Sequence, residues 1–135
     1  MRTSKISIPL AVFSFAACHV HAQSPDLFGS AEAGQNVGKV ATVCCTVVQG
    51  THMMSLKGEP TFLNCDGRFR SANHTFTFVI WGTARPDYYP PPEQLQGKCA
   101  CGTGPISTYQ SKPQIQNPKS LYEARTDDEK SKCRR

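Results

Sequence analysis

The chain has 135 residues, of which 39% are hydrophobic and 19% charged, and its formal net charge is +5. This length is enough for one small domain with its own core and excludes a second domain of similar size. The positive charge is mild: it excludes a dedicated charge stripe for nucleic acid but is compatible with a moderate preference for polyanions.

Residues 1–22 have the pattern of an export signal. Arg2 and Lys5 supply positive charge, and a short apolar run follows up to Ala17. The run is shorter than the ~20 residues of a membrane-spanning helix. We therefore expect cleavage after Ala22 and a mature protein that is periplasmic or secreted.

A lipoprotein signal is the alternative for the same segment. The four residues that end at Cys18 resemble a bacterial lipobox, although Phe15 stands where an aliphatic residue is usual. In that case Cys18 carries a lipid that anchors the protein to the outer membrane. No other apolar stretch is long enough to cross a membrane, so we expect no transmembrane segment.

Three regions follow the signal. Residues 23–37 are small and polar and predict a flexible leader. Residues 38–119 contain the β-type segments of the chain. Residues 120–135 are charged and predict a frayed helix or a disordered tail.

Five segments between residues 38 and 115 have strand character. They are rich in β-branched and aromatic residues and are separated by Gly, Pro, Asn and Asp. The segments cover residues 38–48, 60–66, 75–82, 95–106 and 112–115. The third alternates Thr75 and Thr77 with Phe76 and Phe78 and ends in an apolar run, which indicates burial on both faces at its end.

The connections also carry signals. Residues 49–59 predict a loop, and residues 85–92 exclude a helix or a central strand because they end in three consecutive prolines. Residues 93–96 predict a single helical turn. Gly97, Gly102 and Gly104 punctuate the fourth segment, where glycine indicates a bulge or a close backbone approach, and residues 106–116 predict a final hairpin.

Seven cysteines are present, and six remain after removal of the signal. An even number in an exported chain indicates disulfide bonds, but the sequence alone does not choose among the many pairings. Zinc binding with help from His52 and His74 is the alternative. It is disfavoured because the chain lacks the C-x-x-C pair of a zinc ribbon and because an oxidising compartment favours disulfides.

No motif for catalysis is found. The chain lacks a Gly-rich phosphate loop, a nucleophile elbow and a metal-binding helix. Neither His52 nor His74 has a convincing nucleophile or orienting group beside it in sequence. We therefore expect no enzymatic activity, no cofactor and no metal.

The order of the segments over residues 38–115 resembles the small secreted OB-fold proteins of bacteria, relatives of the nucleic-acid-binding anticodon-type OB domains. The resemblance implies an all-β fold: a five-stranded OB-fold Greek-key barrel over residues 38–119. Such a barrel is above all a binding scaffold. Cys45, Cys65 and Cys99 depart from the family pattern, which usually has glycine or aliphatic residues there.

The resemblance also implies one disulfide pair. In an OB barrel the first strand pairs with the fourth, and the family commonly has cysteines where this chain has Cys44 and Cys101, so we expect these two to be bonded. The connectivity beyond this pair stays open: Cys65 is the nearest candidate partner for Cys45, a choice that leaves Cys99 and Cys133 for each other.

The binding residues are expected among aromatic and basic side chains. OB folds bind single strands through their second and third strands and the flanking loops, with bases stacked on aromatics and cations along the phosphates. The candidates are Arg68, Phe69, Arg70, Phe76, Arg85, Tyr88, Tyr89, Lys98, Tyr109 and Lys112. The loops around Phe69 and Tyr88 are expected to form one arginine–aromatic rim, whereas Phe62, Phe78 and Trp81 are expected to fill the core.

Single-stranded DNA or RNA is the expected partner. The alternative is a non-enzymatic cell-envelope protein that binds a protein or an oligosaccharide through the same face.

Overall fold

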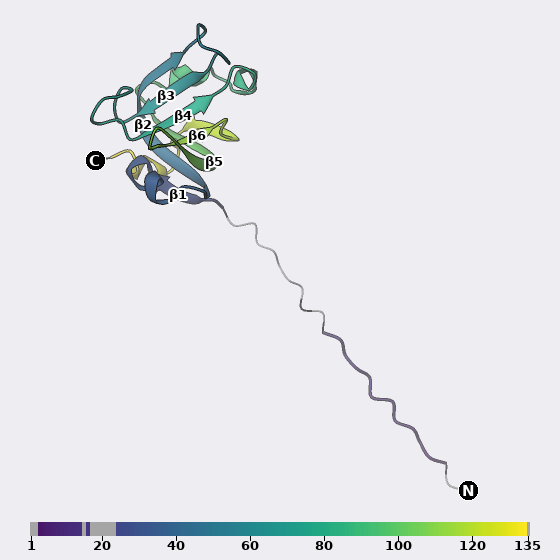
Figure 1. Ribbon diagram of the computed structural model, residues 1–135. Coiled ribbons are helices and arrows are strands. Elements are labelled where there is room, and N and C mark those ends of the chain that lie inside the picture. Colours follow the sequence, from purple (N-terminus) through teal and green to yellow (C-terminus); the bar gives the residue numbers. More distant parts are fainter. Residues whose placement is uncertain (1–2, 15, 17–23, 135) are drawn as a thin grey trace.

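The computed structural model describes residues 3–14, 16 and 24–134. Residues 3–14 lead away from the folded part and contain no helix or strand (Figure 1). The predicted cleavage site after Ala22 and the alternative lipidation site at Cys18 lie outside the described residues. In the part of the chain that is described, no helix is long and apolar enough to cross a membrane.

The described chain is built mainly from strands. The strands are β1 (Asp26–Gly29), β2 (Val40–His52), β3 (Thr61–Cys65), β4 (Phe76–Ile80), β5 (Cys99–Tyr109), β6 (Lys112–Gln116) and β7 (Ser120–Glu123). The helices are short: three 3₁₀ helices, η1 (Ser30–Gln35), η2 (Arg85–Asp87) and η3 (Pro92–Leu95), and one α-helix, α1 (Asp127–Ser131).

The two long strands, β2 and β5, organise the fold (Figure 1). Their first halves pair antiparallel, from Val40 opposite Pro105 to Thr46 opposite Cys99, with β1 beside β2 and β7 beside β5. We call these four segments the first sheet. The second half of β2 pairs with β3, followed by β4, β6 and the second half of β5. We call these the second sheet, in which β4 and β6 are parallel.

The structure corrects the predicted five-stranded barrel. The predicted pairing of the first β-segment with the fourth is present as β2–β5. However, the described residues form seven strands, and their pairings divide into two sheets that share β2 and β5. The first halves of these long strands would otherwise expose edges, and β1 and β7, which lie outside residues 38–119, cover them.

The core lies between the inward faces of the strands. Its largest fully buried side chains include Phe76 and Phe78 of β4. Their rings contact edge to face, with centroids 5.0 Å apart. All five residues of β4 are buried, which confirms the prediction for the third segment. Phe76, predicted as a stacking residue, cannot meet a ligand because it is fully buried.

The predicted flexible leader is wrong. β1 pairs in parallel with β2, and η1 buries Ser30 and Ala33. Phe28 packs against the core. These apolar contacts and the new strand pairing order a segment whose small polar composition suggested mobility.

The C-terminal segment is also more ordered than predicted. β7 pairs with β5, and Thr126 caps α1 by accepting a hydrogen bond from the Glu129 N–H. Burial raises the pKa of Glu129, but hydrogen bonds from the Tyr122 hydroxyl and from the backbone N–H groups of Thr126 and Arg125 outweigh it and lower this pKa to about 2. Burial, together with the hydrogen bond to Glu129 and its charge, raises the pKa of Tyr122 to about 12.

Two connections differ from the prediction. β2 continues to His52, so part of the predicted loop 49–59 is strand. At Gly50 the strand passes close to η3: a Cβ on Gly50 would lie 3.1 Å from Glu93 Cα. η2 forms where a helix was excluded, because Pro86 occupies a first-turn position whose N–H is not needed. The single turn at residues 93–96 corresponds to η3, and the final hairpin is confirmed by Tyr109 opposite Lys112.

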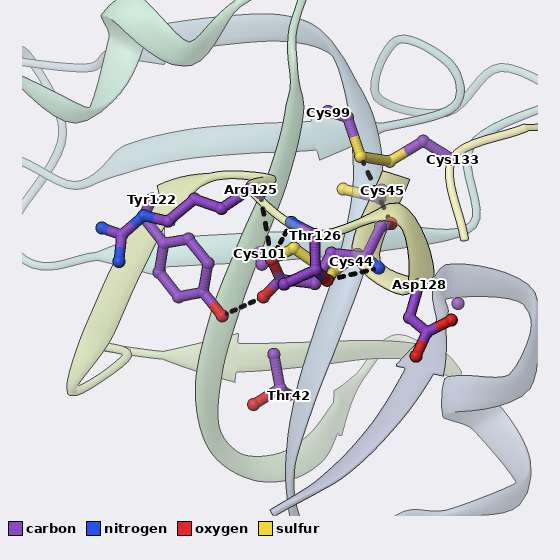
Figure 2. The surroundings of a disulfide bond; sticks show 12 residues. Thr42, Cys44, Cys45, Cys99, Cys101, Tyr122, Arg125, Thr126, Asp128 and Cys133 are labelled. Atoms are coloured by element: carbon purple, nitrogen blue, oxygen red, sulfur yellow. Dashed lines mark hydrogen bonds between the residues drawn. A yellow bond between two sulfur atoms is a disulfide. The ribbon is translucent and has the colours of Figure 1, made fainter. Parts of the chain in front are cut away.

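The expected Cys44–Cys101 disulfide is present, and the structure settles the pairing of the other four cysteines. Cys44 bonds to Cys101, Cys45 to Cys65 and Cys99 to Cys133, with Cα atoms 4.1, 5.6 and 5.8 Å apart. Figure 2 shows the Cys99–Cys133 bond, which ties the segment after α1 to β5, near the Cys44–Cys101 bond. Because these six cysteines are bonded to one another, they supply no thiolate for zinc. Three disulfides are typical of an oxidising, extracellular compartment.

Candidate functional site

A groove of about 580 Å³ crosses the outer face of the second sheet. Its floor is made by residues of β2, β3, β4 and β6, and in β3 and β4 these alternate with residues that point into the core. Three connections form its walls: residues 53–60 between β2 and β3, residues 66–75 between β3 and β4, and the β5–β6 turn.

A row of polar side chains runs across the middle of the floor. Gln49 of β2 lies opposite Asn64 of β3, Asn64 opposite Thr77 of β4, and Thr77 opposite Gln114 of β6. Thr77 Oγ1 donates to Asn64 Oδ1 at 3.0 Å, and Asn64 Nδ2 donates to Gln49 Oε1 at 3.1 Å. We call Gln49, Asn64, Thr77 and Gln114 the polar row.

His74 closes one end of these hydrogen bonds. Its Nε2 lies 2.7 Å from Thr77 Oγ1. Because that hydroxyl gives its proton to Asn64, it accepts from His74, so Nε2 carries the proton of the neutral ring. Burial and the nearby Lys112 charge lower the pKa of His74, which favours this neutral form. His74 is therefore a buried residue in the lining of the groove.

Aromatic and basic side chains gather on one side of the polar row. Phe69 and Arg70 come from the β3–β4 connection, and Tyr109 and Lys112 flank the β5–β6 turn. The Phe69 and Tyr109 side chains are 51% and 60% exposed, so each presents part of its ring to solvent. The Arg70 guanidinium carbon lies 5.3 Å from the Phe69 ring centroid, and Lys112 Nζ donates to the His74 carbonyl.

The other side of the row is apolar. Phe62 and Val79 form the floor there, and Met53 and Leu56 form the wall. Phe62 was expected in the core, but period-two alternation in β3 places it on the outer face, where it is only half-buried. Trp81 is also only partly buried, and its Nε1 donates to Gln116.

In the part of the chain that the structure describes, the residues that line this groove include no aspartate or glutamate. Arg70 and Lys112 are therefore the charges that border it, and the groove favours an anionic ligand. Its two sides differ: cations and aromatic rings border one, and uncharged apolar side chains border the other.

The remaining predicted site residues lie elsewhere. Tyr88, Tyr89 and Lys98 line a second groove of about 750 Å³, which shares no lining residue with the first. Lys98 is 3.6 Å from Glu123 in an ion pair, and the Tyr88 hydroxyl donates to the Pro118 carbonyl. The predicted rim is therefore wrong in joining the Phe69 and Tyr88 loops.

Arg85 and Arg68 line neither groove. Arg85 donates to Glu93 at 2.7 Å and to Thr61 at 2.8 Å, so its charge is engaged inside the fold. Arg68 is exposed on the connection that carries Phe69. Within the described residues, no group of three or more His, Cys, Asp or Glu side chains could hold a metal ion.

The sequence interpretation missed the polar row. Asn64 and Thr77 are polar residues that alternate with apolar ones along their strands, which is the signal for a face turned away from the core. Their alignment with Gln49 and Gln114 depends on strand register, for which the sequence carried no signal.

No family model and no curated protein matches the chain. Among solved structures, it is similar to the OB domain of MM0293 from Methanosarcina mazei, with a TM-score of 0.53 and 17% identity over 77% of this chain and 88% of that one. It also resembles part of a structure described as an aspartyl-tRNA synthetase from Leishmania major Friedlin, with a TM-score of 0.47 and 11% identity over 78% of this chain and 22% of that one. The first likeness shows an OB-type fold for this chain.

Proposed function

We propose that this chain binds single-stranded nucleic acid in the groove across the second sheet, without catalysing a reaction. We propose further that it does so outside the cytoplasm. The disulfides and the export-signal pattern of residues 1–22 support that location.

One observation carries the proposal: half-exposed aromatic rings and cations meet in a groove without acidic residues. Phe69 and Tyr109 offer ring faces or edges for bases, and Arg70 and Lys112 offer charge for phosphates. This is the combination by which proteins hold single strands.

The place of the groove in the fold supports the same function. β3 and β4 are the second and third strands of the OB-type arrangement. OB folds bind oligonucleotides on these strands and on the loops between strands one and two and between strands four and five. In this chain those two loops supply Leu56 and Gln110 to the groove walls.

The test is fluorescence anisotropy with a labelled single-stranded oligonucleotide of about ten residues, a length within the range of one OB fold. Phe69→Ala and Tyr109→Ala should each weaken binding by about 1–3 kcal/mol, the usual value of one stacked base. Tyr89→Ala is the matched control, because Tyr89 is 96% exposed but lines the other groove.

The basic residues are tested by salt dependence. Each phosphate contact to a single strand adds ~0.7 to the slope of log affinity against log salt, so removing Arg70 and Lys112 together should lower the slope by ~1.4. Lys119→Ala, in the other groove, should leave it unchanged. Absence of binding at low salt would refute the proposal and favour a protein or oligosaccharide ligand on the same face.

A further inference from the structure

We propose that the groove recognises the hydrogen-bonding edge of a base and not only its ring face, and that Gln49 is the residue that does so. The inference rests on the proposed function and adds a specificity-determining residue to it.

The orientation of the Gln49 amide is set by its neighbours. Its Oε1 accepts two hydrogen bonds, from Asn64 Nδ2 at 3.1 Å and from the Phe69 backbone N–H at 3.3 Å. A flipped amide would present its NH₂ group to two donors and lose both bonds. Gln49 is thus held with its oxygen inward and its NH₂ group directed away from these partners.

The NH₂ group of Gln49 is left to the groove. Among the residues that the structure describes, no hydrogen bond from Gln49 Nε2 is found. If this nitrogen were buried it would count as a buried polar atom without a partner, and it does not. It is therefore accessible and reaches the open groove that Gln49 lines. The groove floor therefore presents an amide donor at the β2 end of the polar row.

The rest of the row is already engaged. Asn64 uses both its oxygen and its nitrogen within the row, and Thr77 uses its hydroxyl with Asn64 and His74. Gln114, at the opposite end, places its Nε2 3.5 Å from Ser107 Oγ. Gln49 is therefore the member whose donor group is both oriented and uncommitted.

A fixed donor selects among ligands. A ligand that covers the groove removes water from Gln49 Nε2, and the binding free energy then depends on whether the ligand supplies an acceptor in its place. Keto oxygens and unprotonated ring nitrogens of bases are such acceptors. A flat ring that stacks equally well but lacks an acceptor leaves the amide unpaired and binds more weakly.

The experiment compares two ligands of the same shape on the full chain. One is an oligothymidylate, and the other carries difluorotoluene, a thymine-shaped ring without strong hydrogen-bond acceptors, at every position. Wild type should bind the oligothymidylate roughly tenfold more tightly, the effect of one neutral hydrogen bond.

Gln49→Glu keeps an oxygen for Asn64 and for the Phe69 N–H but replaces the donor by a second oxygen. The preference should then fall to one or below. Gln114→Glu is the matched control, because it adds the same charge to the opposite end of the row, and it should keep the tenfold preference. Using the ratio of the two ligands within each variant cancels the general repulsion between the new charge and the phosphates.

The outcomes separate the two proposals. If wild type binds both oligonucleotides equally well, base-edge recognition is wrong while nucleic-acid binding stands. Persistence of the preference in a folded Gln49→Glu variant would assign recognition to another residue and overturn the role of Gln49. If neither oligonucleotide binds, the proposed function itself fails.

Discussion

Gly102 lies in β5 at a point where the Phe78 ring covers the strand. A Cβ on Gly102 would lie 2.5 Å from Phe78 Cε1, much closer than van der Waals contact allows. Phe78 is fully buried and packs edge to face against Phe76, so its ring has little room to retreat. We therefore expect Gly102→Ala to destabilise the fold.

The magnitude follows from two opposing effects. Forcing an extra carbon into a well-packed core costs about 1–3 kcal/mol. Replacing glycine by alanine restricts the unfolded chain and returns about 0.4–1 kcal/mol. The net loss should be about 1–2 kcal/mol, which lowers the melting temperature of a domain of this size by roughly 5–15 °C.

Urea unfolding with intact disulfides measures the loss, and the single tryptophan, Trp81, provides the fluorescence signal. Gly34→Ala is the control, because a Cβ on Gly34 meets no atom within 4 Å; it restricts the unfolded chain without a clash and should stabilise the fold by about 0.4–1 kcal/mol. A truncated ring in Phe78→Leu should relieve the clash, so the two substitutions should be non-additive. A Gly102→Ala variant as stable as wild type would refute the contact between β5 and the Phe78 ring.

Three further predictions follow from the structure. Replacing Cys99 and Cys133 together by serine should cost about 3–4 kcal/mol in urea unfolding, because their bond closes a 34-residue separation; a loss below ~1 kcal/mol would mean that the reduced segment stays docked without it. Glu129, with a pKa lowered from 4.5 to about 2, contributes stability that is complete above pH 4.5 and disappears as the pH falls through 2. Glu129→Gln should therefore flatten the plot of unfolding free energy against pH between about pH 2 and 4.5. If the plots of the variant and the wild type run parallel there, Glu129 is not the group responsible. Arg85→Ala should lower the free energy of unfolding by about 1 kcal/mol, because its contacts with Glu93 and Thr61 are lost. Oligonucleotide affinity should stay unchanged. Weaker binding would mean that Arg85 does contact the ligand.

The central strands could be predicted because their signals are local. β4 combines β-branched and aromatic residues with a continuous apolar end, and the β5–β6 hairpin is marked by polar residues between two strand-forming runs. The Cys44–Cys101 pair followed from the strand order that the resemblance implied. Each of these features depends on a short segment or on a pairing common to OB folds.

The outer strands could not be predicted in the same way. β1 and β7 have four residues each, too few for a clear alternation. They are held by pairing with β2 and β5, and the segment after β7 by a disulfide to Cys99. These contacts join residues far apart in sequence, so composition alone suggested mobile ends.

The candidate site was predicted in part. Phe69, Arg70, Tyr109 and Lys112 do line one groove. Phe76 was misplaced, although period-two alternation puts it on the same face of β4 as Phe78, which was expected in the core. The position of Gln49 was hidden because β2 has a register shift between Val47 and Gln49 that no sequence signal marks.

Two of the three cross-links lie away from the groove, and this arrangement has a physical reason. Cys44–Cys101 lies within the first sheet and Cys99–Cys133 ties the chain end to it, whereas the groove crosses the second sheet. A chain of this length buries a small core, and aromatic side chains left exposed at the groove add little to it. Covalent bonds in the first sheet offset that loss. Cys45–Cys65 joins the two regions at the start of the connection that carries Phe69, so the groove wall is anchored at the residue from which it leaves β3. The second sheet can then present half-exposed rings to a ligand while the fold remains stable.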